Sequence, residues 1–516
     1  MTVKNLLVAR AEDDSPGLRA GDERWTWREY VARARGRAAA LDALLDRSRP
    51  PHVGVLCENT PEMAFQLAAA GFGAHVLVGL NSTRRGDALL ADARKADVQV
   101  LVVEPALAGL LDGLDLTGIT VVDAATHPWP EDAPLPDASP ADGDLFMLIF
   151  TSGTSGEPKA VRVTHEKITY PAAYLTERLG LTGDDVHYVS MPLFHSNGVM
   201  AGWGPALSNG AEITLAPRFS ARGFLDDVRR YGASYANYVG KPLAYVLATP
   251  ERPDDADNPL RLVFGNEAGD RDTAAFAERF GCRVVDGFGS TENAVVVSRV
   301  EGTPPGSLGQ PAPGVAVYDP ETGTECPRAV FDDAGRVTNL DACTGELVNT
   351  TGTGQFAGYY NDEAATAERM RGGMYWSGDL AYRDADGWVY YAGRTADWLR
   401  VDGENLAAAP VERILLRHPT VSEAAVYAVP DPRSGDQLVV ALVTTGSLEP
   451  EEWESFLAAQ QDLSPKAWPR YVRVLETLPR TATNKVLKRD LQATGLGDVT
   501  WVREERGTTY LTPSAP

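Results

Sequence analysis

Short apolar runs alternate with longer stretches of mixed polarity along the first part of the chain. Runs rich in β-branched residues at 53–56, 98–103 and 145–150 indicate strands, and the stretch 28–45 indicates a helix. Strands that alternate with helices are joined by crossovers, which place the strands parallel to one another. The pattern therefore predicts a mainly parallel sheet over residues 25–215.

Two further patterns follow along the chain. The alternation resumes at 234–239, 261–264 and 283–286, which predicts a second α/β layer. A segment rich in Pro and Gly at 304–314 then leads into short strands separated by turns, which is typical of a small β subdomain. These strands are expected at 330–339, 346–350 and 389–392.

The polar, turn-rich sequence GRTADWLRVDGEN at 393–405 lies between segments of different pattern. We place a domain boundary there, with an N-terminal domain at 1–395 and a C-terminal domain at 396–516. Within the second domain, strands at 424–429 and 438–443 and a helix at 450–459 predict a compact α+β fold. The predicted fold class is α/β, with two mainly parallel sheet layers, a small β subdomain and a smaller α+β domain.

Composition and charge narrow the functional classes. A chain of 516 residues, 44% of them apolar and 23% charged, exceeds the size of one hydrophobic core, so two or more domains are expected. The net charge of -23 would repel phosphate backbones, which argues against a nucleic-acid partner. Any polyphosphate must therefore be bound by a local site that acts against the overall charge.

The sequence predicts a cytoplasmic protein without stable membrane insertion. The first residues, MTVKNLLVARAEDD, become acidic too soon for a signal peptide. The longest apolar stretch, at 65–80, contains Gln66 and His75, so it predicts a buried helix followed by a strand. The four cysteines form no CxxC pair, which disfavours disulfides and structural zinc and fits a reducing compartment.

A loop with the composition of a phosphate site follows the predicted strand at 145–150. The sequence from Thr151 to Lys159 carries four hydroxyl groups, two glycines and one lysine in nine residues. Such a loop can approach oxyanions with its backbone, donate hydrogen bonds to them and balance their charge. It differs from the GxxxxGK[ST] loop of P-loop NTPases, because 160–164 predicts another strand instead of a helix. An ordinary exposed Ser/Thr/Gly loop is the alternative interpretation.

Two other clusters carry candidate chemistry. The sequence VDGFGSTE at 285–292 again ends an apolar strand in a turn that contains Gly. If this turn and the Thr151–Lys159 loop converge at strand ends, Glu292 can hold a magnesium ion and Thr291 can contact phosphate. In MPLFHSNG at 191–198, His195 follows an apolar run. Taken singly, a solvated turn and a buried core histidine are the competing interpretations.

In this order, the segments resemble the adenylate-forming superfamily of acyl-CoA synthetases, peptide-synthetase adenylation domains and luciferases. The resemblance runs from GDERWTWREY at 21–30 to PRTATNKVLKRDL at 479–491, with GELVNT, GYYN and YWSGDL between them. Within the superfamily, YVGKPLAYVL, RLVFGNEAGD and DGENLAAAPVE look most like the fatty-acid-transport and very-long-chain acyl-CoA synthetase branch. The transporters' amino-terminal membrane segment is missing, which favours a soluble bacterial-type ligase.

The resemblance implies an acyl-CoA ligase for a fatty or bulky hydrophobic acid. It would use ATP, Mg²⁺ and CoA, forming an acyl-adenylate and then the thioester, with release of pyrophosphate and AMP. Because the attack of a carboxylate on a phosphate brings two anions together, the site must neutralise charge. The implied catalytic residues are Lys485, His195, Thr151 and Glu292, and the implied metal ligands are Glu292 and Thr154.

Two further sets of residues are implied by the resemblance. The nucleotide would contact Thr151, Ser152, Gly153, Thr154, Ser155, Gly156, Lys159, Gly265, Asn266, Glu267, Ala268, Asp286, Gly287, Phe288, Gly289, Ser290, Thr291, Asp379, Arg394 and Lys485. The acid would lie against Phe194, His195, Asn237, Tyr238, Val239, Gly265 and Phe288.

The family's small C-terminal domain is mobile and presents a different face in each half-reaction. Lys485 would act during adenylation, Ala396 and Asp397 would form the hinge, and Gly403 and Glu404 would line the CoA tunnel. The pair Phe194–His195 would lie between this tunnel and the acid.

Three positions depart from the usual family pattern: Ser155 in the phosphate loop, Ala396 at the hinge, and Asn484 where Gly is usual before the catalytic lysine. Because Asn484 can alter the presentation of Lys485, a thioester-forming enzyme that acts mainly on a preformed acyl-adenylate is one alternative. Its partner would be an adenylate-supplying enzyme. An acyl-AMP ligase that loads a carrier protein is a second alternative, and a non-catalytic acyl or adenylate binder is a third.

Overall fold

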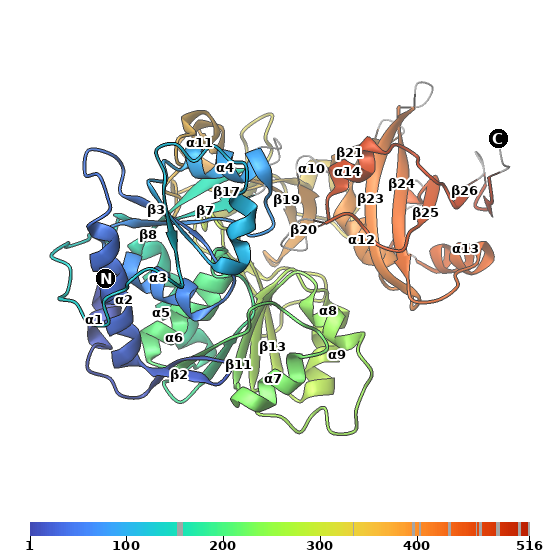
Figure 1. The fold of residues 1–516 in the computed structure, drawn as a ribbon. Coiled ribbons are helices and arrows are strands. Elements are labelled where there is room, and N and C mark those ends of the chain that lie inside the picture. Colours follow the sequence, from blue (N-terminus) through green and yellow to red (C-terminus); the bar gives the residue numbers. More distant parts are fainter. Residues whose placement is uncertain are drawn as a thin grey trace. The chain divides into compact units, whose positions relative to one another are not determined.

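The computed structural model describes residues 1–151, 158–333, 335–394, 398–401, 404–431, 435–460, 462–463, 467–480, 486–503 and 507–513. Its contacts divide the chain into two compact units (Figure 1). Unit 1 contains Met1–Ala294 and Thr353–Glu368, and unit 2 contains Val295–Gly352 and Arg369–Pro516. The predicted boundary between 395 and 396 falls inside unit 2, so it stays a prediction about domains within that unit.

The first sheet of unit 1 has six strands in the order β6-β5-β3-β4-β7-β8. All neighbours are parallel except β7 and β8, which form an antiparallel pair on either side of the candidate phosphate loop. The predicted strand after that loop is thus confirmed. The strands are β3 (His52–Leu56), β4 (Val76–Gly79), β5 (Val100–Val103), β6 (Thr120–Asp123), β7 (Leu145–Thr151) and β8 (Lys159–Thr164).

The second sheet of unit 1 runs in the order β13-β12-β11-β9-β10-β1-β2. Its strands are β1 (Pro16–Ala20), β2 (Glu23–Thr26), β9 (Val186–Val189), β10 (Glu212–Leu215), β11 (Tyr235–Val239), β12 (Leu262–Asn266) and β13 (Arg283–Phe288). The prediction of one sheet over 25–215 is therefore wrong, because β9 and β10 pair with β11 and β1 instead. Apolar alternation specifies a strand, and tertiary packing decides which sheet the strand joins.

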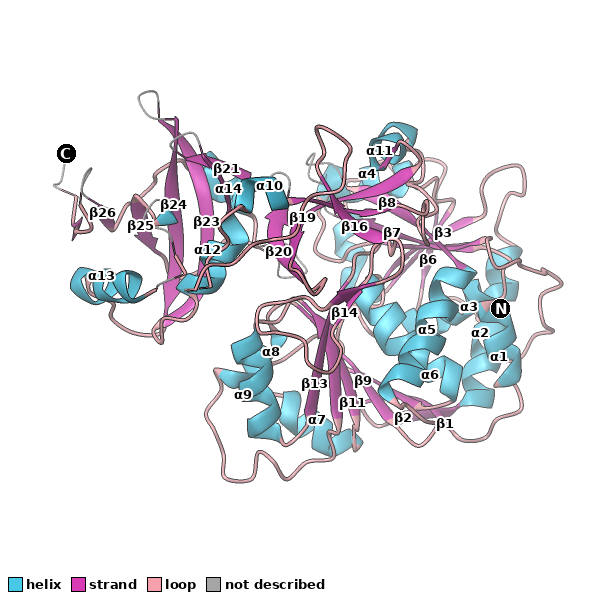
Figure 2. Cartoon of the chain, turned by 180° about the vertical axis from the view of Figure 1, so that it is seen from behind, coloured by secondary structure: helices cyan, strands magenta, loops and turns pink. Residues whose placement is uncertain are grey.

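A layer of helices packs between the two sheets of unit 1 (Figure 2). Its helix α2 begins where the Thr26 hydroxyl accepts from the Glu29 backbone N–H and the Glu29 side chain accepts from the Thr26 backbone N–H. The Trp203 indole donates to the Tyr30 hydroxyl (2.9 Å), and this hydroxyl donates to the Ala64 carbonyl (2.7 Å), so these two buried side chains have hydrogen-bond partners inside the core. The layer contains α1 (Val3–Ala9), α2 (Trp27–Asp42), α3 (Pro61–Gly71), α5 (His165–Leu179), the π-helix η2 (Gly198–Trp203) and α6 (Gly204–Asn209).

The remaining helices of unit 1 cover other faces. Helices α7, α8 and α9 lie together beside β11 and β13 in Figure 1, and their apolar residues form a separate core cluster with those strands. The stretch 65–80 is a helix followed by a strand, as predicted. These further helices are α4 (Gly86–Lys95), the 3-10 helix η1 (Pro105–Leu111), α7 (Phe224–Tyr231), α8 (Pro242–Leu247), α9 (Asp270–Phe280) and α11 (Glu363–Arg369).

Unit 2 begins with the predicted β subdomain, in which β16-β17-β19-β18 form an antiparallel sheet with β20 paired to β19. The predicted strand at 330–339 is wrong: in its described part, a single Phe331–Val337 bridge flanks a turn that contains Asp332 and Gly335. The elements are β14 (Val297–Ser298), β15 (Gln310–Pro311), β16 (Val315–Tyr318), α10 (Leu340–Cys343), β17 (Gly345–Asn349), β18 (Met370–Arg371), β19 (Met374–Arg383) and β20 (Val389–Arg394).

The rest of unit 2 is an α+β arrangement around the sheet β22-β21-β24-β25-β26-β27, with β23 paired to β24. The helix predicted at 450–459 is confirmed, and so are both predicted strands. The elements are β21 (Trp398–Val401), β22 (Glu404–Ala407), α12 (Ala408–Leu415), β23 (Val421–Asp431), β24 (Gly435–Thr444), α13 (Pro450–Ala459), β25 (Tyr471–Val474), α14 (Lys488–Ala493), β26 (Trp501–Arg503) and β27 (Tyr510–Leu511). Within the described residues, none of the helices combines the length and apolarity needed to span a bilayer.

Candidate active site

The parallel register of β11, β12 and β13 brings predicted site residues into one row. Tyr238 lies opposite Gly265, and Gly265 lies opposite Asp286. One residue further along, Val239, Asn266 and Gly287 form the next row. Carboxyl ends of parallel strands are the usual place for a ligand in such sheets. The structure thus places these residues of the predicted nucleotide and acid sites next to one another.

Asp286 joins the three strand ends through its carboxylate. The Tyr238 hydroxyl donates to Oδ2 of Asp286 (2.6 Å), and the Ala268 backbone N–H donates to the same oxygen (3.1 Å). The Tyr238 ring lies so close to Gly265 that an added Cβ there would be 2.5 Å from a ring carbon, so only glycine fits. The loop after β12 also holds Glu267 at φ +70°, a strained backbone for a residue with a side chain.

Tyr359 lies between two predicted phosphate-site groups. Its hydroxyl donates to Oε1 of Glu292 (2.8 Å), and its ring centroid lies 5.2 Å from Nζ of Lys159. Lys159 is 5% exposed and lies 3.6 Å from the exposed carboxylate of Glu368. The Glu292 and Lys159 segments therefore converge at Tyr359, which is the condition that the assignment of Glu292 requires. Thr151, at the end of β7, pairs with Lys159 of β8, and its hydroxyl donates a long hydrogen bond of 3.5 Å to the Lys159 carbonyl.

Lys167 is a charged residue near this site that sequence reasoning did not assign. It follows the N-cap Thr164 of α5, is 1% exposed, and its ammonium group has no hydrogen-bond partner in the described part of the chain. Burial lowers the pKa of Lys167 to about 7, and the negative charge of Glu292 acts in the opposite direction. The available signal was its rarity: the chain has only eight lysines, and this one follows the strand after the phosphate loop.

The His195 segment contacts both of these regions. The Ser196 and Thr291 hydroxyl oxygens lie 2.9 Å apart within hydrogen-bond distance. Asn197 donates to the Tyr238 carbonyl (2.9 Å) and accepts from the Asn237 side chain (2.7 Å). The segment leads directly into η2, and π-helical turns are frequent at functional sites.

The aromatic pair in this segment has two different environments. Phe194 is buried, whereas His195 is only partly buried, and their ring centroids are 5.8 Å apart. Phe194 packs against Gly79 of β4, where an added Cβ would lie 2.9 Å from the Cβ of Phe194. Phe194 is therefore fixed by the core. His195 is the member of the pair that solvent or a ligand can reach.

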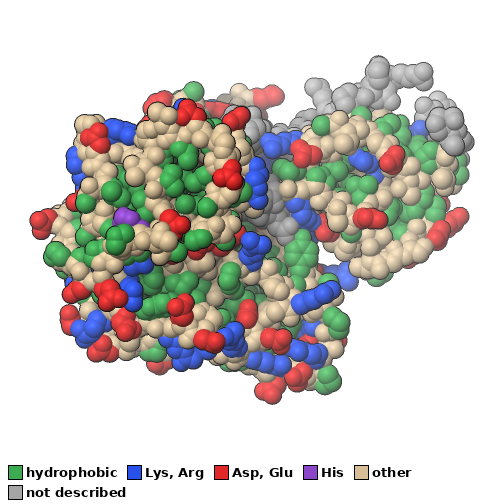
Figure 3. All heavy atoms as spheres, in the orientation of Figure 1, with side chains coloured by type: hydrophobic (Ala, Val, Ile, Leu, Met, Phe, Trp, Pro, Cys, Tyr) green, Lys and Arg blue, Asp and Glu red, His purple; other side chains and the backbone are tan. Residues whose placement is uncertain are grey.

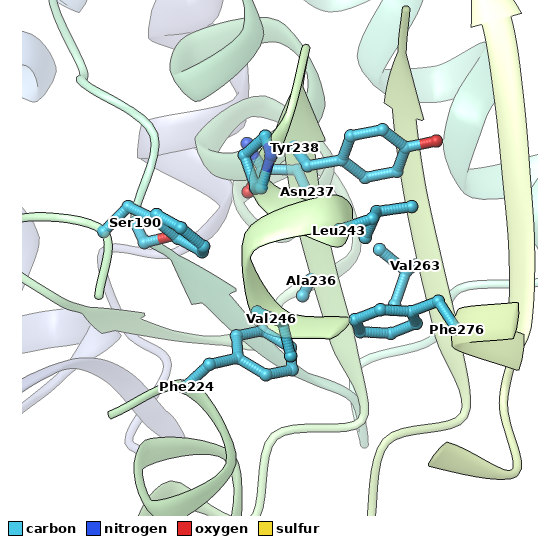
Figure 4. A pocket seen from close by; sticks show the side chains of 11 residues that line it. Ser190, Phe224, Ala236, Asn237, Tyr238, Leu243, Val246, Val263 and Phe276 are labelled. Carbon is cyan, nitrogen blue, oxygen red and sulfur yellow. The ribbon is translucent and has the colours of Figure 1, made fainter. Parts of the chain in front are cut away.

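An apolar pocket lies between β11, β12 and the helices α7 to α9 (Figure 4). Asn237 and Tyr238 line it, but Phe194, His195, Val239, Gly265 and Phe288 do not, so this pocket gathers only part of the predicted acid site. In Figure 4 the Tyr238 hydroxyl points away from Phe224 and Val246, consistent with its bond to Asp286. The other lining residues are Ser190, Phe219, Phe224, Ala236, Pro242, Leu243, Val246, Val263 and Phe276.

Asp379 and Arg394, the predicted ribose contacts, pair across β19 and β20 of unit 2. Their atoms Oδ1 and Nε are 3.3 Å apart, and the aspartate is buried while the Arg394 side chain is 42% exposed. The structure therefore brings these two together. Solvent screens the exposed guanidinium, so the pair adds little to stability.

Several predicted residues lie outside the described part of the chain. These are Ser152, Gly153, Thr154, Ser155, Gly156, Ala396, Asp397, Gly403, Asn484 and Lys485. Glu404 begins β22. Gly289 and Ser290 lie in the turn between β13 and Thr291, where an added Cβ at Gly289 would meet no atom within 4 Å.

The net charge of the protein does not form a single acidic face in the view of Figure 3. Acidic and basic side chains are interspersed on the described surface that it shows. An anion that approaches this face therefore meets alternating local charges instead of one repulsive field.

Comparison with known proteins identifies related sequences over nearly the whole chain. Residues 8–360 match the family model for the AMP-binding enzyme, and residues 410–485 match that for the AMP-binding enzyme C-terminal domain. The medium/long-chain-fatty-acid–CoA ligase FadD17 of Mycobacterium marinum is 52% identical over 510 residues, which cover 97% of this chain and 98% of that protein. Steroid-22-oyl-CoA synthetase of Rhodococcus jostii is 46% identical over 505 residues, which cover 95% of this chain and 90% of that protein.

A solved structure has the same fold. The O-succinylbenzoate coenzyme A synthetase MenE from Bacillus subtilis, in complex with ATP and magnesium ion, superposes with a TM-score of 0.76. The match covers 94% of this chain and 99% of that chain at 24% identity. The predicted α/β fold class, with its β subdomain and small C-terminal domain, is confirmed.

The replacement Lys167→Met tests the electrostatic cost of the buried ammonium group. Because its pKa is about 7 in the folded protein against 10.5 ordinarily, the unfolded chain binds more protons between these pH values. The stability of the wild type should therefore rise with pH across this window, relative to the variant, by at most about 1.4 kcal/mol per pH unit. Urea unfolding at several pH values, without ATP or Mg²⁺, measures the difference. If the free energies of unfolding of the wild type and of Lys167→Met changed with pH in parallel, the lowered pKa of Lys167 would be contradicted.

Proposed function

The chain belongs to the family of AMP-binding enzymes and is an AMP-forming acyl-CoA ligase, and we propose that it activates a medium- or long-chain fatty acid. The observation that carries this choice of acid is the 52% identity to a ligase of that specificity, which extends over 97% of the chain. A match of this length includes both the residues around the strand ends and the C-terminal region. We propose the cytoplasm as the place of action, in keeping with four buried free thiols.

A steroid side-chain acid is the second candidate substrate. The 46% identity to steroid-22-oyl-CoA synthetase over 505 residues favours it specifically. Both relatives are acyl-CoA ligases, so the superfamily inferred from the sequence is retained. Neither is named for the fatty-acid-transport or very-long-chain branch, so we replace that finer prediction with these two acid classes.

We propose that ATP binds across the ends of β7, β12 and β13. Lys159 supplies positive charge to the triphosphate, and Glu292 faces the accompanying Mg²⁺. A single carboxylate suits this ion, whose coordination shell is usually completed by phosphate oxygens and waters. When bound, Mg²⁺ neutralises charge on the phosphates and so favours attack by a second anion. Asp379 accepts hydrogen bonds from the ribose hydroxyls, with Arg394 beside it.

The remaining predicted residues take the following proposed roles. The segments 265–268 and 286–288 border the adenine, and the bond from the Ala268 backbone N–H to Asp286 connects them. His195, partly buried beside the fixed Phe194, borders the acid and the approach of the thiol. Lys485 contacts the substrate carboxylate during adenylation, Ala396 and Asp397 act as the hinge, and Gly403 and Glu404 face the pantetheine of CoA.

The alternatives from the sequence lead to different acceptors or partners. In one alternative the acceptor is a carrier-protein thiol instead of CoA. In the other, a partner enzyme supplies the acyl-adenylate. Both alternatives proceed through an acyl-adenylate. CoA is favoured here because both relatives are named as CoA ligases or synthetases. A carrier protein that outcompetes CoA for the acyl group would reverse this choice.

A panel of acids tests the proposed substrate class. Fatty acids of graded chain length, a steroid side-chain acid and a short acid should be assayed separately for pyrophosphate release and for CoA thioester. We expect kcat/KM to be highest for medium or long chains, because each buried methylene contributes about 0.8 kcal/mol. A clear preference for the steroid acid would select the second candidate. If thioester formed from synthetic acyl-adenylates but not from the free acids and ATP, the alternative of an enzyme that uses a supplied acyl-adenylate would be selected.

Two replacements test the separation of the half-reactions. Lys485→Ala should lower pyrophosphate release by ~10²-fold or more, since it removes a group that orients the reactants. It should leave thioester formation from a supplied acyl-adenylate unchanged. Gly403→Leu should have the opposite pattern, because its side chain obstructs the thiol. Equal losses in both half-reactions for Lys485→Ala would contradict the role of Lys485 in adenylation. Unimpaired CoA capture by Gly403→Leu would contradict the placement of Gly403 in the CoA tunnel.

A further inference from the structure

Tyr359 belongs to the GYYN sequence at 358–361, and its backbone is fixed against the edge strand β8. It forms an antiparallel bridge with Val161, and the neighbouring Tyr360 backbone N–H donates to the Ala160 carbonyl (2.7 Å). The backbone N–H of Tyr359 donates to the Thr366 hydroxyl (2.9 Å). Edge strands need such cover, and here the cover also determines where the Tyr359 side chain lies.

The Tyr359 side chain is buried and has contacts both at its ring and at its hydroxyl. It is 5% exposed and packs edge-on against Phe356, with ring centroids 5.1 Å apart. Its hydroxyl donates to Glu292, which is 67 residues away in the sequence, at 2.8 Å. The ammonium group of Lys159 lies over the ring, 5.2 Å from its centroid, at a distance typical of cation–π contacts.

The ring thus contacts a cation on one side and an anion at its hydroxyl end. A direct ion pair between Lys159 and Glu292 would let each neutralise the other, leaving less charge for an incoming polyphosphate and its metal. Lys159 forms an ion pair with the exposed Glu368, at 3.6 Å. A tyrosine can interact with both charges at once, because its face attracts cations and its hydroxyl donates to carboxylates.

We propose that Tyr359 is a positioning residue that holds Glu292 and Lys159 apart and oriented, so that both can act on one magnesium-bound triphosphate. This inference rests on the proposed function. Tyr359 does not touch the reacting atoms in this scheme. It acts through Glu292, by a hydrogen bond to a charged group, and through Lys159, by the face of its ring.

The neighbouring Tyr360 provides a matched control. Its hydroxyl also donates to a carboxylate oxygen, Oδ2 of Asp97, at the same distance of 2.8 Å. Its ring contacts His52, with centroids 4.9 Å apart. Tyr360→Phe therefore removes the same kind of bond from the same segment, but from a carboxylate that has no assigned role in the site.

The experiment compares Tyr359→Phe with Tyr360→Phe. Calorimetry measures binding of Mg·ATP, and assays measure pyrophosphate release and thioester formation from synthetic acyl-adenylate. A hydrogen bond to a charged group corresponds to roughly 10-fold or more in affinity, so Tyr359→Phe should weaken Mg·ATP binding by about that factor. It should leave thioester formation and thermal stability near wild type. Tyr360→Phe should bind Mg·ATP within about twofold of wild type.

A double variant tests whether the effect passes through Glu292. In a Glu292→Gln background, Tyr359→Phe should weaken Mg·ATP binding much less than it does alone, because the bond to the charged group is already lost. Additive effects would overturn the proposal. So would equal weakening by Tyr360→Phe, unchanged binding by Tyr359→Phe, or a parallel loss of both half-reactions and stability. If the wild type binds no Mg·ATP at all, the proposed function falls together with this inference.

Discussion

The side-by-side register of β11, β12 and β13 is the constraint on which the candidate site depends. It places Tyr238, Gly265 and Asp286 in one row, and the carboxylate of Asp286 then connects the strand ends by accepting from Tyr238 and Ala268. The glycine is required because the tyrosine ring occupies the space of its missing side chain. A slip of one residue would turn every side chain of a strand to the opposite face and separate these groups.

The second requirement is electrostatic. A protein with a net charge of -23 has to bind a polyphosphate and bring a carboxylate to it. In the proposed site this requirement is met locally: Lys159 is buried, Glu292 is the proposed ligand of the divalent ion, and Tyr359 contacts both. Lys167 is a second buried amine near this site, and the negative charge of Glu292 favours its protonated form against the effect of burial. Such charges are effective because the low dielectric of the interior screens them less than water would.

The sequence could predict the features that one short segment encodes. It could not predict the contacts that form only when distant segments pack together. The strand β8 was predictable from its own apolar run, and the hydroxyls, glycines and lysine that gather within nine residues before it are the local signal for the proposed phosphate loop. The contact between Tyr359 and Glu292 could not be predicted, because it requires the segment 353–368 to return to β8. Lys167 looked like an ordinary helix residue, because its burial arises only when α5 packs in the core. The strand expected at 330–339 failed because Asp332 and Gly335 form a turn.

Direct detection of the acyl-adenylate tests the central claim most sharply. The enzyme should be mixed with α-labelled ATP, Mg²⁺ and a long-chain fatty acid, without CoA, and quenched on the timescale of a single turnover. We predict that labelled acyl-adenylate accumulates to about one equivalent per active site and disappears into AMP and acyl-CoA when CoA is added. Absence of this species with every acid tested, under conditions where the protein is folded and binds ATP, would contradict a two-step ligase.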